Sequence, residues 1–247
     1  MRLRNTVRGW VGKLQILLLL ILFVCNPFAD AAAIEFGMFK ENTIFSKDTD
    51  GFKDKVLLLF HGLRSAHPNS TFRRLEKALS DEYSVVGVNY DYLDVERNKR
   101  ELDDLWTRYL AGHEVFVLGT SLGGFWADYF ANKYGLEKMV LVNPVTSPVH
   151  DLTQFVGEQY SERRQKHFVV TPEHIEDYAA LPLPTHPNTK SLVILTRDDP
   201  VINFRQALEK YLKNENSQLV IFGTGGHSLP LSDPKYLSAL KAFFESK

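Results

Sequence analysis

A serine between two glycines is the first feature of this sequence that could carry chemistry. Ser121 lies in the stretch GTSLG (119–123), which follows an aliphatic run (114–119) and precedes a helical pattern (122–135). In a nucleophile elbow the serine projects from a sharp strand-to-helix turn, and the positions two before and two after it must be small because strand and helix nearly collide. The pattern predicts that Ser121 is a nucleophile for acyl chemistry, with the amide of Leu122 facing the developing oxyanion.

Two alternatives explain less of this motif. A serine helix cap would account for Ser121 but not for the paired glycines. A phosphate-binding loop would need the Walker lysine or the spacing G-x-G-x-x-G, and neither is present here. The strand–turn–helix context therefore favours a nucleophile.

A nucleophilic serine needs a histidine base and an acid that orients it, in the chain order serine, acid, histidine. His227 follows a strand pattern (218–223) behind two glycines, where this order requires the base. Every other histidine precedes Ser121 or lies within residues 145–189. We therefore predict that His227 is the base.

Two adjacent aspartates compete for the role of the acid. Asp198 and Asp199 both follow the strand pattern 191–196. Pro200 suits a first helical turn, so Asp199 is also a candidate helix cap, a role compatible with catalysis. We favour Asp199 because residues 200–202 resemble the helix entry after a triad acid, and Asp198 remains the alternative.

The second oxyanion donor is expected in the loop after an earlier strand. The aliphatic run 55–60 ends in His61 and Gly62, and the amide of Leu63 is the natural partner of the Leu122 amide. We interpret His61 as a structural hydrogen-bonding group rather than a second base. No metal site is predicted, because HExxH is absent and the histidines lack close ligand spacing.

These residues need a scaffold that gathers strand ends at one edge. Strand patterns without polar alternation are covered on both faces, so they predict a mostly parallel central sheet with helices on both faces. The segment 34–45 could add an antiparallel edge hairpin. The strand patterns lie at 55–60, 83–90, 114–119, 138–144, 191–196 and 218–223, and the helical patterns at 72–80, 95–110, 122–135, 204–213 and 234–246.

The alternation is interrupted at residues 145–189, which are mostly polar and contain prolines. Such an excursion is too long for an ordinary connection and is usually functional. We expect one domain, 32–247, with this segment as a small, partly helical cap insertion.

The N-terminus has the pattern of a secretory signal. A basic stretch (1–13) precedes an apolar run of about a dozen residues and small residues in an A-x-A arrangement. We predict a signal peptide at 1–31 and a periplasmic or secreted protein without stable membrane insertion after cleavage; an uncleaved anchor is the minor alternative.

Cys25, the only cysteine, lies within this segment, which excludes a disulfide framework and cysteine catalysis in the mature chain. A net charge of −1 without a basic block gives no indication of a nucleic-acid partner.

Four stretches together resemble the YqiA-type esterases of the α/β-hydrolase superfamily. They are HGLRSA (61–66), LGTSLGGFWA (118–127), LVNPVTSPVHDLTQFVG (141–157), and DDPVINFRQALEKY (198–211) ahead of GGHS (225–228). The resemblance implies an α/β-hydrolase fold, Ser121 as nucleophile, Asp199 as acid, His227 as base, and no cofactor. Leu63 stands where the family usually has phenylalanine. The family is typically cytosolic, whereas this chain begins with an export pattern.

The expected activity is that of a serine esterase. It would cleave small carboxylic esters or thioesters through an acyl-enzyme on Ser121, with a small-molecule acyl ester as its partner. An acyltransferase of the same fold is one alternative. A non-catalytic binding protein that retains the fold is the other.

Overall fold

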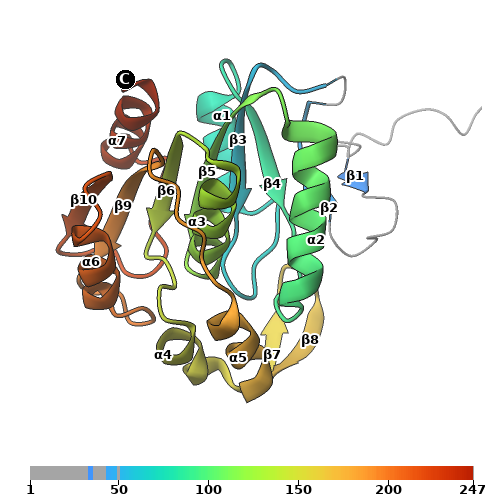
Figure 1. The fold of residues 1–247 in the computed structure, drawn as a ribbon, viewed down its shortest axis with the longest axis vertical. Coiled ribbons are helices and arrows are strands. Elements are labelled where there is room, and N and C mark those ends of the chain that lie inside the picture. The colour runs from blue at the N-terminus through green and yellow to red at the C-terminus, as the bar shows by residue number, and fades with distance from the viewer. Residues whose placement is uncertain (1–32, 36–42, 49–50, 247) are drawn as a thin grey trace, which may run out of the picture. The chain divides into compact units, whose positions relative to one another are not determined.

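The computed structural model describes residues 33–35, 43–48 and 51–246 of the 247-residue chain. Its main sheet has eight strands in the order β1-β2-β4-β3-β5-β6-β9-β10 (Figure 1). Six of these strands, β4 to β10 in that order, run parallel, and β1 and β2 pair antiparallel at one edge. The strands are β1 (Ala33–Glu35), β2 (Thr43–Phe45), β3 (Lys55–Phe60), β4 (Ser84–Val88), β5 (Glu114–Thr120), β6 (Lys138–Val142), β9 (Lys190–Thr196) and β10 (Ser217–Phe222).

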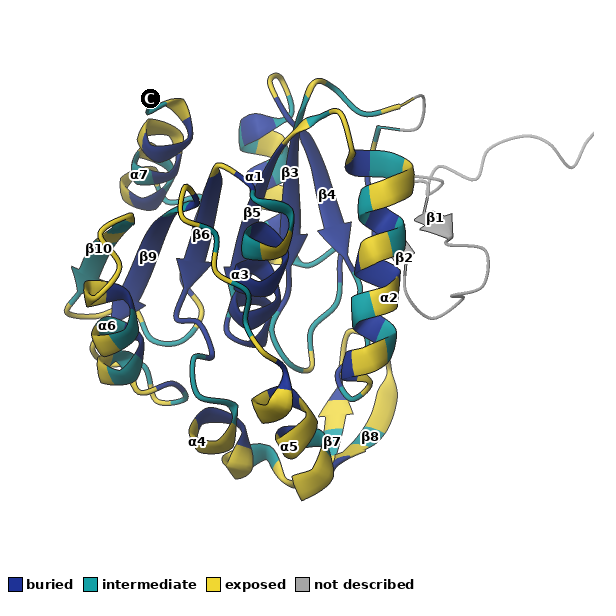
Figure 2. Ribbon diagram, viewed as in Figure 1, coloured by how far each residue is buried: buried dark blue, intermediate teal, exposed yellow. Residues whose placement is uncertain are grey.

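Helices cover both faces of this sheet, as predicted. Alternate side chains of a strand point to opposite faces: Val56 and Leu58 of β3 belong to one buried apolar cluster, and Leu57 and Leu59 belong to the other. The first cluster lies under α2, α3 and α6, and the second under α1 and α7; β3, β4, β5, β6 and β9 are buried throughout their central part, whereas the edge strand β10 is half-buried (Figure 2). These helices are α1 (Ser70–Leu79), α2 (Val95–Leu105), α3 (Leu122–Tyr134), α6 (Phe204–Leu212) and α7 (Pro234–Glu245).

One helix differs from its sequence pattern, and the edge hairpin agrees with its own. The helix predicted over 95–110 is an α-helix only to Leu105 and continues as a π-helical turn, η1 (Trp106–Leu110). The predicted edge hairpin is confirmed by the pairing of β1 with β2, although residues 36–42 lie outside the described residues. The predicted signal segment, 1–31, also lies outside them. Within the described part of the chain, no helix is long and apolar enough to cross a bilayer.

Between β6 and β9 the chain leaves the sheet and forms five short elements. They include an antiparallel hairpin, β7–β8, which the sequence patterns did not predict. Its strands alternate exposed and half-buried side chains (Figure 2), so no aliphatic run marks them in the sequence. The elements are α4 (Pro148–Leu152), η2 (Thr153–Phe155), β7 (Gly157–Ser161), β8 (Lys166–Val170) and α5 (Pro172–Ala180).

Candidate active site

Ser121 occupies a strained turn between β5 and α3. Its φ of 57° and ψ of −124° are unusual for a residue with a side chain, and its hydroxyl makes no helix-capping hydrogen bond. The helix-cap alternative is therefore wrong. The strained backbone is held from both sides: the Ser121 amide donates to the carbonyl of Val142 (3.0 Å), and the Ser121 carbonyl accepts from the amides of Gly124 (2.8 Å) and Val145 (3.0 Å). Such strain persists only where the surroundings enforce it.

The glycines around Ser121 are required by close packing of the main chain. A Cβ atom on Gly119 would lie 2.1 Å from the carbonyl oxygen of Gly123, and one on Gly123 would lie 2.2 Å from the carbonyl oxygen of Phe60. A Cβ on Gly124 would lie 2.6 Å from the Cβ of Pro144. The size argument made from the sequence is thus confirmed, since strand and helix leave no room for a methyl group here.

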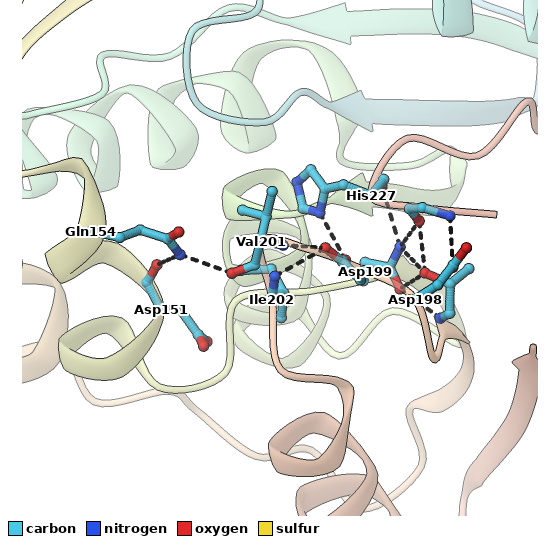
Figure 3. Close-up of polar contacts among 10 residues, drawn as sticks. Asp151, Gln154, Asp198, Asp199, Val201, Ile202 and His227 are labelled. Atoms are coloured by element: carbon cyan, nitrogen blue, oxygen red, sulfur yellow. Dashed lines mark hydrogen bonds and ion pairs between the residues drawn. The ribbon is translucent and has the colours of Figure 1, made fainter. Parts of the chain in front are cut away.

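Asp199 is the aspartate that contacts the histidine. Its Oδ2 accepts a hydrogen bond from His227 Nδ1 at 2.8 Å, and its side chain is only 1% exposed (Figure 3). Its Oδ1 accepts from the amides of Val201 (2.7 Å) and Ile202 (3.0 Å), which orients the carboxylate. The expectation that Asp199 also caps the next helix is wrong, because Asn203 caps α6 and Asp199 closes the turn before it.

Asp198 supports the histidine loop rather than the histidine ring. Its two carboxylate oxygens accept from the amides of Gly225 (3.1 Å) and Gly226 (2.8 Å). The Gly226 and Gly225 amides hold the pKa of the Asp198 carboxyl below its usual value. The two neighbouring aspartates therefore have different partners, and the one that contacts His227 is Asp199, which the sequence favoured (Figure 3).

Asn143 holds the same loop and was missed by the sequence analysis. This buried residue follows β6 with a φ of 43°. Its Nδ2 donates to the carbonyls of Gly226 and His227, both at 3.2 Å, and its Oδ1 accepts from the amide of Thr196 at 2.9 Å. It thus joins the end of β9 to the histidine loop. The only sequence signal was its place in the run LVNP, which carried the family resemblance without indicating a role.

Ser121 and His227 line one cavity of about 260 Å³ at the carboxyl end of the parallel strands. Within the described residues no hydrogen bond joins the Ser121 hydroxyl to His227. In hydrolases without bound substrate this catalytic hydrogen bond is often long, and it shortens only when substrate binds. Leu63 also lines the cavity, and Leu122 is the first residue of α3. Neither of these two amides donates to an acceptor in the described part of the chain.

His61 is a structural residue, as expected. It is buried, its ring stacks on Tyr90 with 4.6 Å between centroids, and its Nδ1 donates to the carbonyl of Gly62 at 2.9 Å. Burial, with smaller contributions from His67 and the Arg164 charge, lowers its pKa well below the usual value. A histidine that stays neutral in this packed position is not an accessible proton carrier. No group of three or more potential metal ligands occurs among the described residues.

The mostly parallel sheet with helices on both faces has the α/β-hydrolase fold. The chain belongs to the uncharacterised protein family UPF0227, whose family model matches residues 56–245, and the resemblance to YqiA-type esterases is confirmed. Similar solved structures include Est1E from Butyrivibrio proteoclasticus, 11% identical with a TM-score of 0.63 over 88% of this chain and 100% of that one.

Two further structures have the same fold. Alpha/beta hydrolase domain-containing protein 10 from mouse is 12% identical, with a TM-score of 0.63 over 88% of this chain and 97% of that one. The esterase domain from a Rhodothermus marinus protein is 15% identical, with a TM-score of 0.59 over 87% of this chain and 97% of that one. At these identities the likeness establishes the architecture alone.

Proposed function

We propose that this protein is a serine hydrolase that cleaves small carboxylic esters or thioesters through an acyl-enzyme on Ser121. The observation that carries the proposal is the 2.8 Å hydrogen bond between His227 and the buried Asp199, on the wall of the cavity that also exposes Ser121. The family membership and the esterases among proteins of the same fold agree with it.

The mechanism follows from the orientation of the histidine. Because Asp199 accepts a hydrogen bond from the Nδ1–H group, Nε2 of His227 is left as the base. His227 takes the Ser121 proton as the serine oxygen attacks the acyl carbon, and then gives it to the departing alcohol or thiol. Water, activated by the same nitrogen, attacks the acyl-enzyme and releases the acid.

The second requirement is to stabilise the negative charge that develops on the acyl oxygen. We assign its stabilisation to the amides of Leu63 and Leu122, which have no protein acceptor in the described chain. Such donors act because they are oriented before the charge forms, and losing one typically costs about 10²- to 10³-fold in kcat.

The test compares the full-length chain with Ser121→Ala. Hydrolysis of 4-nitrophenyl acetate and butyrate and labelling by a fluorophosphonate should both occur in the wild type and vanish in Ser121→Ala. Ser70→Ala is the matched control, because it removes another hydroxyl from the wall of the same cavity and should retain labelling. A folded wild type that neither labels nor turns over would overturn the proposal.

We also propose that the protein is exported, on the strength of the N-terminal sequence pattern at 1–31. Expression of the full-length chain in a bacterial host should give an extracytoplasmic product whose mass corresponds to loss of 31 or 33 residues, since both A-x-A arrangements end there. A full-length cytoplasmic product would contradict this proposal without affecting the enzymatic one.

A further inference from the structure

Two arginines from distant parts of the chain meet at the cavity that contains Ser121. Arg64 follows the oxyanion loop after β3, and Arg163 lies in the turn of the β7–β8 hairpin; both are exposed and both line the cavity. The residues that line it include no aspartate or glutamate. The wall beside the nucleophile therefore carries positive charge with no acid to neutralise it.

Neither Arg64 nor Arg163 forms an ion pair with an aspartate or glutamate in the described part of the chain. By contrast, Arg164 turns away: its guanidinium donates to the Tyr90 carbonyl at 2.6 Å and lies 4.3 Å from the ring centre of Tyr92. The adjacent arginines thus separate into one that builds the fold and one that faces the cavity.

One buried serine joins the loop that carries Arg64 to the hairpin turn that carries Arg163. The hydroxyl of Ser161, at the end of β7, donates to the carbonyl of Arg64 at 2.9 Å and accepts from the amide of Arg164 at 3.2 Å. Arg64 has a φ of 64°, a strained value for arginine, and its guanidinium lies 5.6 Å from the ring centre of Phe155, which also lines the cavity. The fold therefore fixes the main chain at Arg64 and in the turn that carries Arg163, and it places the Arg64 guanidinium beside Phe155.

Two of the histidines on this wall, His61 and His67, do not contribute positive charge. Burial lowers the pKa of His67 to about 3 and that of His61 well below its usual value, so both are neutral near pH 7. The remaining cations of the hairpin turn and β8, such as Lys166, do not line the cavity. Among the residues that line the cavity, Arg64 and Arg163 carry the guanidinium groups, and Arg164 adds a third charge from behind the wall, where it lies 3.4 Å from His61 Nε2.

We propose that the cavity selects esters that carry an anionic group, a carboxylate or a phosphate, and that Arg64 and Arg163 are the residues that recognise this group. The inference rests on the proposed hydrolase function and names its substrate class. Guanidinium groups match carboxylate and phosphate oxygens in geometry and charge. A cleft of one sign also raises the local concentration of an oppositely charged substrate.

The experiment measures kcat/KM for matched esters by pH-stat at low ionic strength. Monoethyl succinate against ethyl butyrate places the anion on the acyl side; butanoyloxyacetate against ethyl butyrate places it on the alcohol side. For each pair the anionic-to-neutral ratio is compared between the full-length wild type and the double variant Arg64→Gln/Arg163→Gln. Lys166→Gln removes one cation from the same hairpin, away from the cavity, and is the matched control.

We expect the ratio for at least one pair to fall about tenfold in the double variant, and the wild-type ratio to decrease as added salt screens the charges. Lys166→Gln should retain the wild-type ratio. Equal ratios in wild type and double variant, with ethyl butyrate still hydrolysed, would overturn anion recognition and leave the hydrolase proposal intact. An equal fall in Lys166→Gln would also overturn it, because a diffuse field would then suffice. No turnover of any ester, together with no labelling of Ser121, would overturn both proposals.

Discussion

The elbow (119–124) and the β7–β8 hairpin (157–170) both contribute residues to one cavity, but different interactions hold them. At the elbow, main chain packs on main chain, and three glycines permit the approach of β5, α3 and the end of β3. The hairpin is a two-stranded sheet with mostly exposed side chains, joined to the main body through side chains such as Ser161. The proposed nucleophile Ser121 is thus placed by backbone packing, whereas Arg163, proposed to recognise the substrate, lies on a hairpin positioned by side chains.

This difference has a physical basis. A carbonyl oxygen of the main chain cannot move away from an added methyl group without displacing a strand, so the elbow tolerates little change. An isolated two-stranded hairpin is only marginally stable, and side-chain hydrogen bonds and ring contacts decide its position. The ring of Phe168 in β8, for example, lies 4.9 Å from that of Tyr92. Substrate selectivity can therefore vary in the hairpin while the elbow stays constant.

The largest expected effect separates the two aspartates beside the histidine. Asp199→Asn should lower kcat by roughly 10³- to 10⁴-fold, because an amide no longer favours the tautomer with the base nitrogen free. Asp198→Asn is the matched control; its amide oxygen can still accept from one of the two loop amides, so about a tenfold loss at most is expected. Steady-state kinetics on 4-nitrophenyl butyrate measure both, and equal losses would contradict the assignment of Asp199.

The next effect tests main-chain packing at the elbow. Gly123→Ala should destabilise the fold by about 3 kcal/mol or more, because its methyl group would lie 2.2 Å from the carbonyl oxygen of Phe60. Gly223→Ala is the control at the same edge of the sheet, where nothing lies within 4 Å of an added Cβ, and a change within about 0.5 kcal/mol is expected. Urea denaturation gives both values; similar stabilities would contradict the packing argument.

A smaller effect is expected at the hairpin anchor. Ser161→Ala leaves the Arg64 carbonyl and the Arg164 amide without their partner, so the local stability of the hairpin should fall by about 1–2 kcal/mol. Hydrogen exchange should quicken in residues 157–170 and stay unchanged in β5. Glu158→Gln, an exposed change on the same hairpin, should exchange like the wild type. Equal acceleration in β5 would show that the two regions do not differ in this way.

The smallest effect at neutral pH concerns His67. Neither ring nitrogen of this buried histidine makes a hydrogen bond of standard geometry in the described chain, and Leu59 offers only a weaker main-chain contact, so His67→Phe should be nearly neutral at pH 7. Burial lowers the folded pKa from 6.5 to about 3, so the unfolded chain takes up the proton first. The wild type therefore loses stability as pH falls from 6.5 toward 3, and His67→Phe should lose less, by up to a few kcal/mol. Urea midpoints at pH 7 and pH 4.5 measure this, and an identical acid loss in both proteins would contradict it.

Several elements could be predicted because their signals are local. Strands β3, β5, β6 and β9 are unbroken aliphatic runs, and such runs indicate strands buried on both faces whatever surrounds them. The hairpin β7–β8 could not be found this way because its polar strands carry no such signal. Asn143 could not be assigned a role either, since its partners lie more than 50 residues further along the chain.

The sequence by itself determined the sheet, the elbow around Ser121, and the chain order that selects His227, because each depends on neighbours within a few residues or on the order of strand ends. The sequence supplied only a preference for Asp199 over Asp198, and the tertiary structure showed which of them contacts His227, since adjacent carboxylates differ only in direction, and direction depends on where the histidine loop returns. The tertiary structure alone brought Arg64 and Arg163 to one cavity wall. Side chains almost 100 residues apart meet only through packing, which no local pattern encodes.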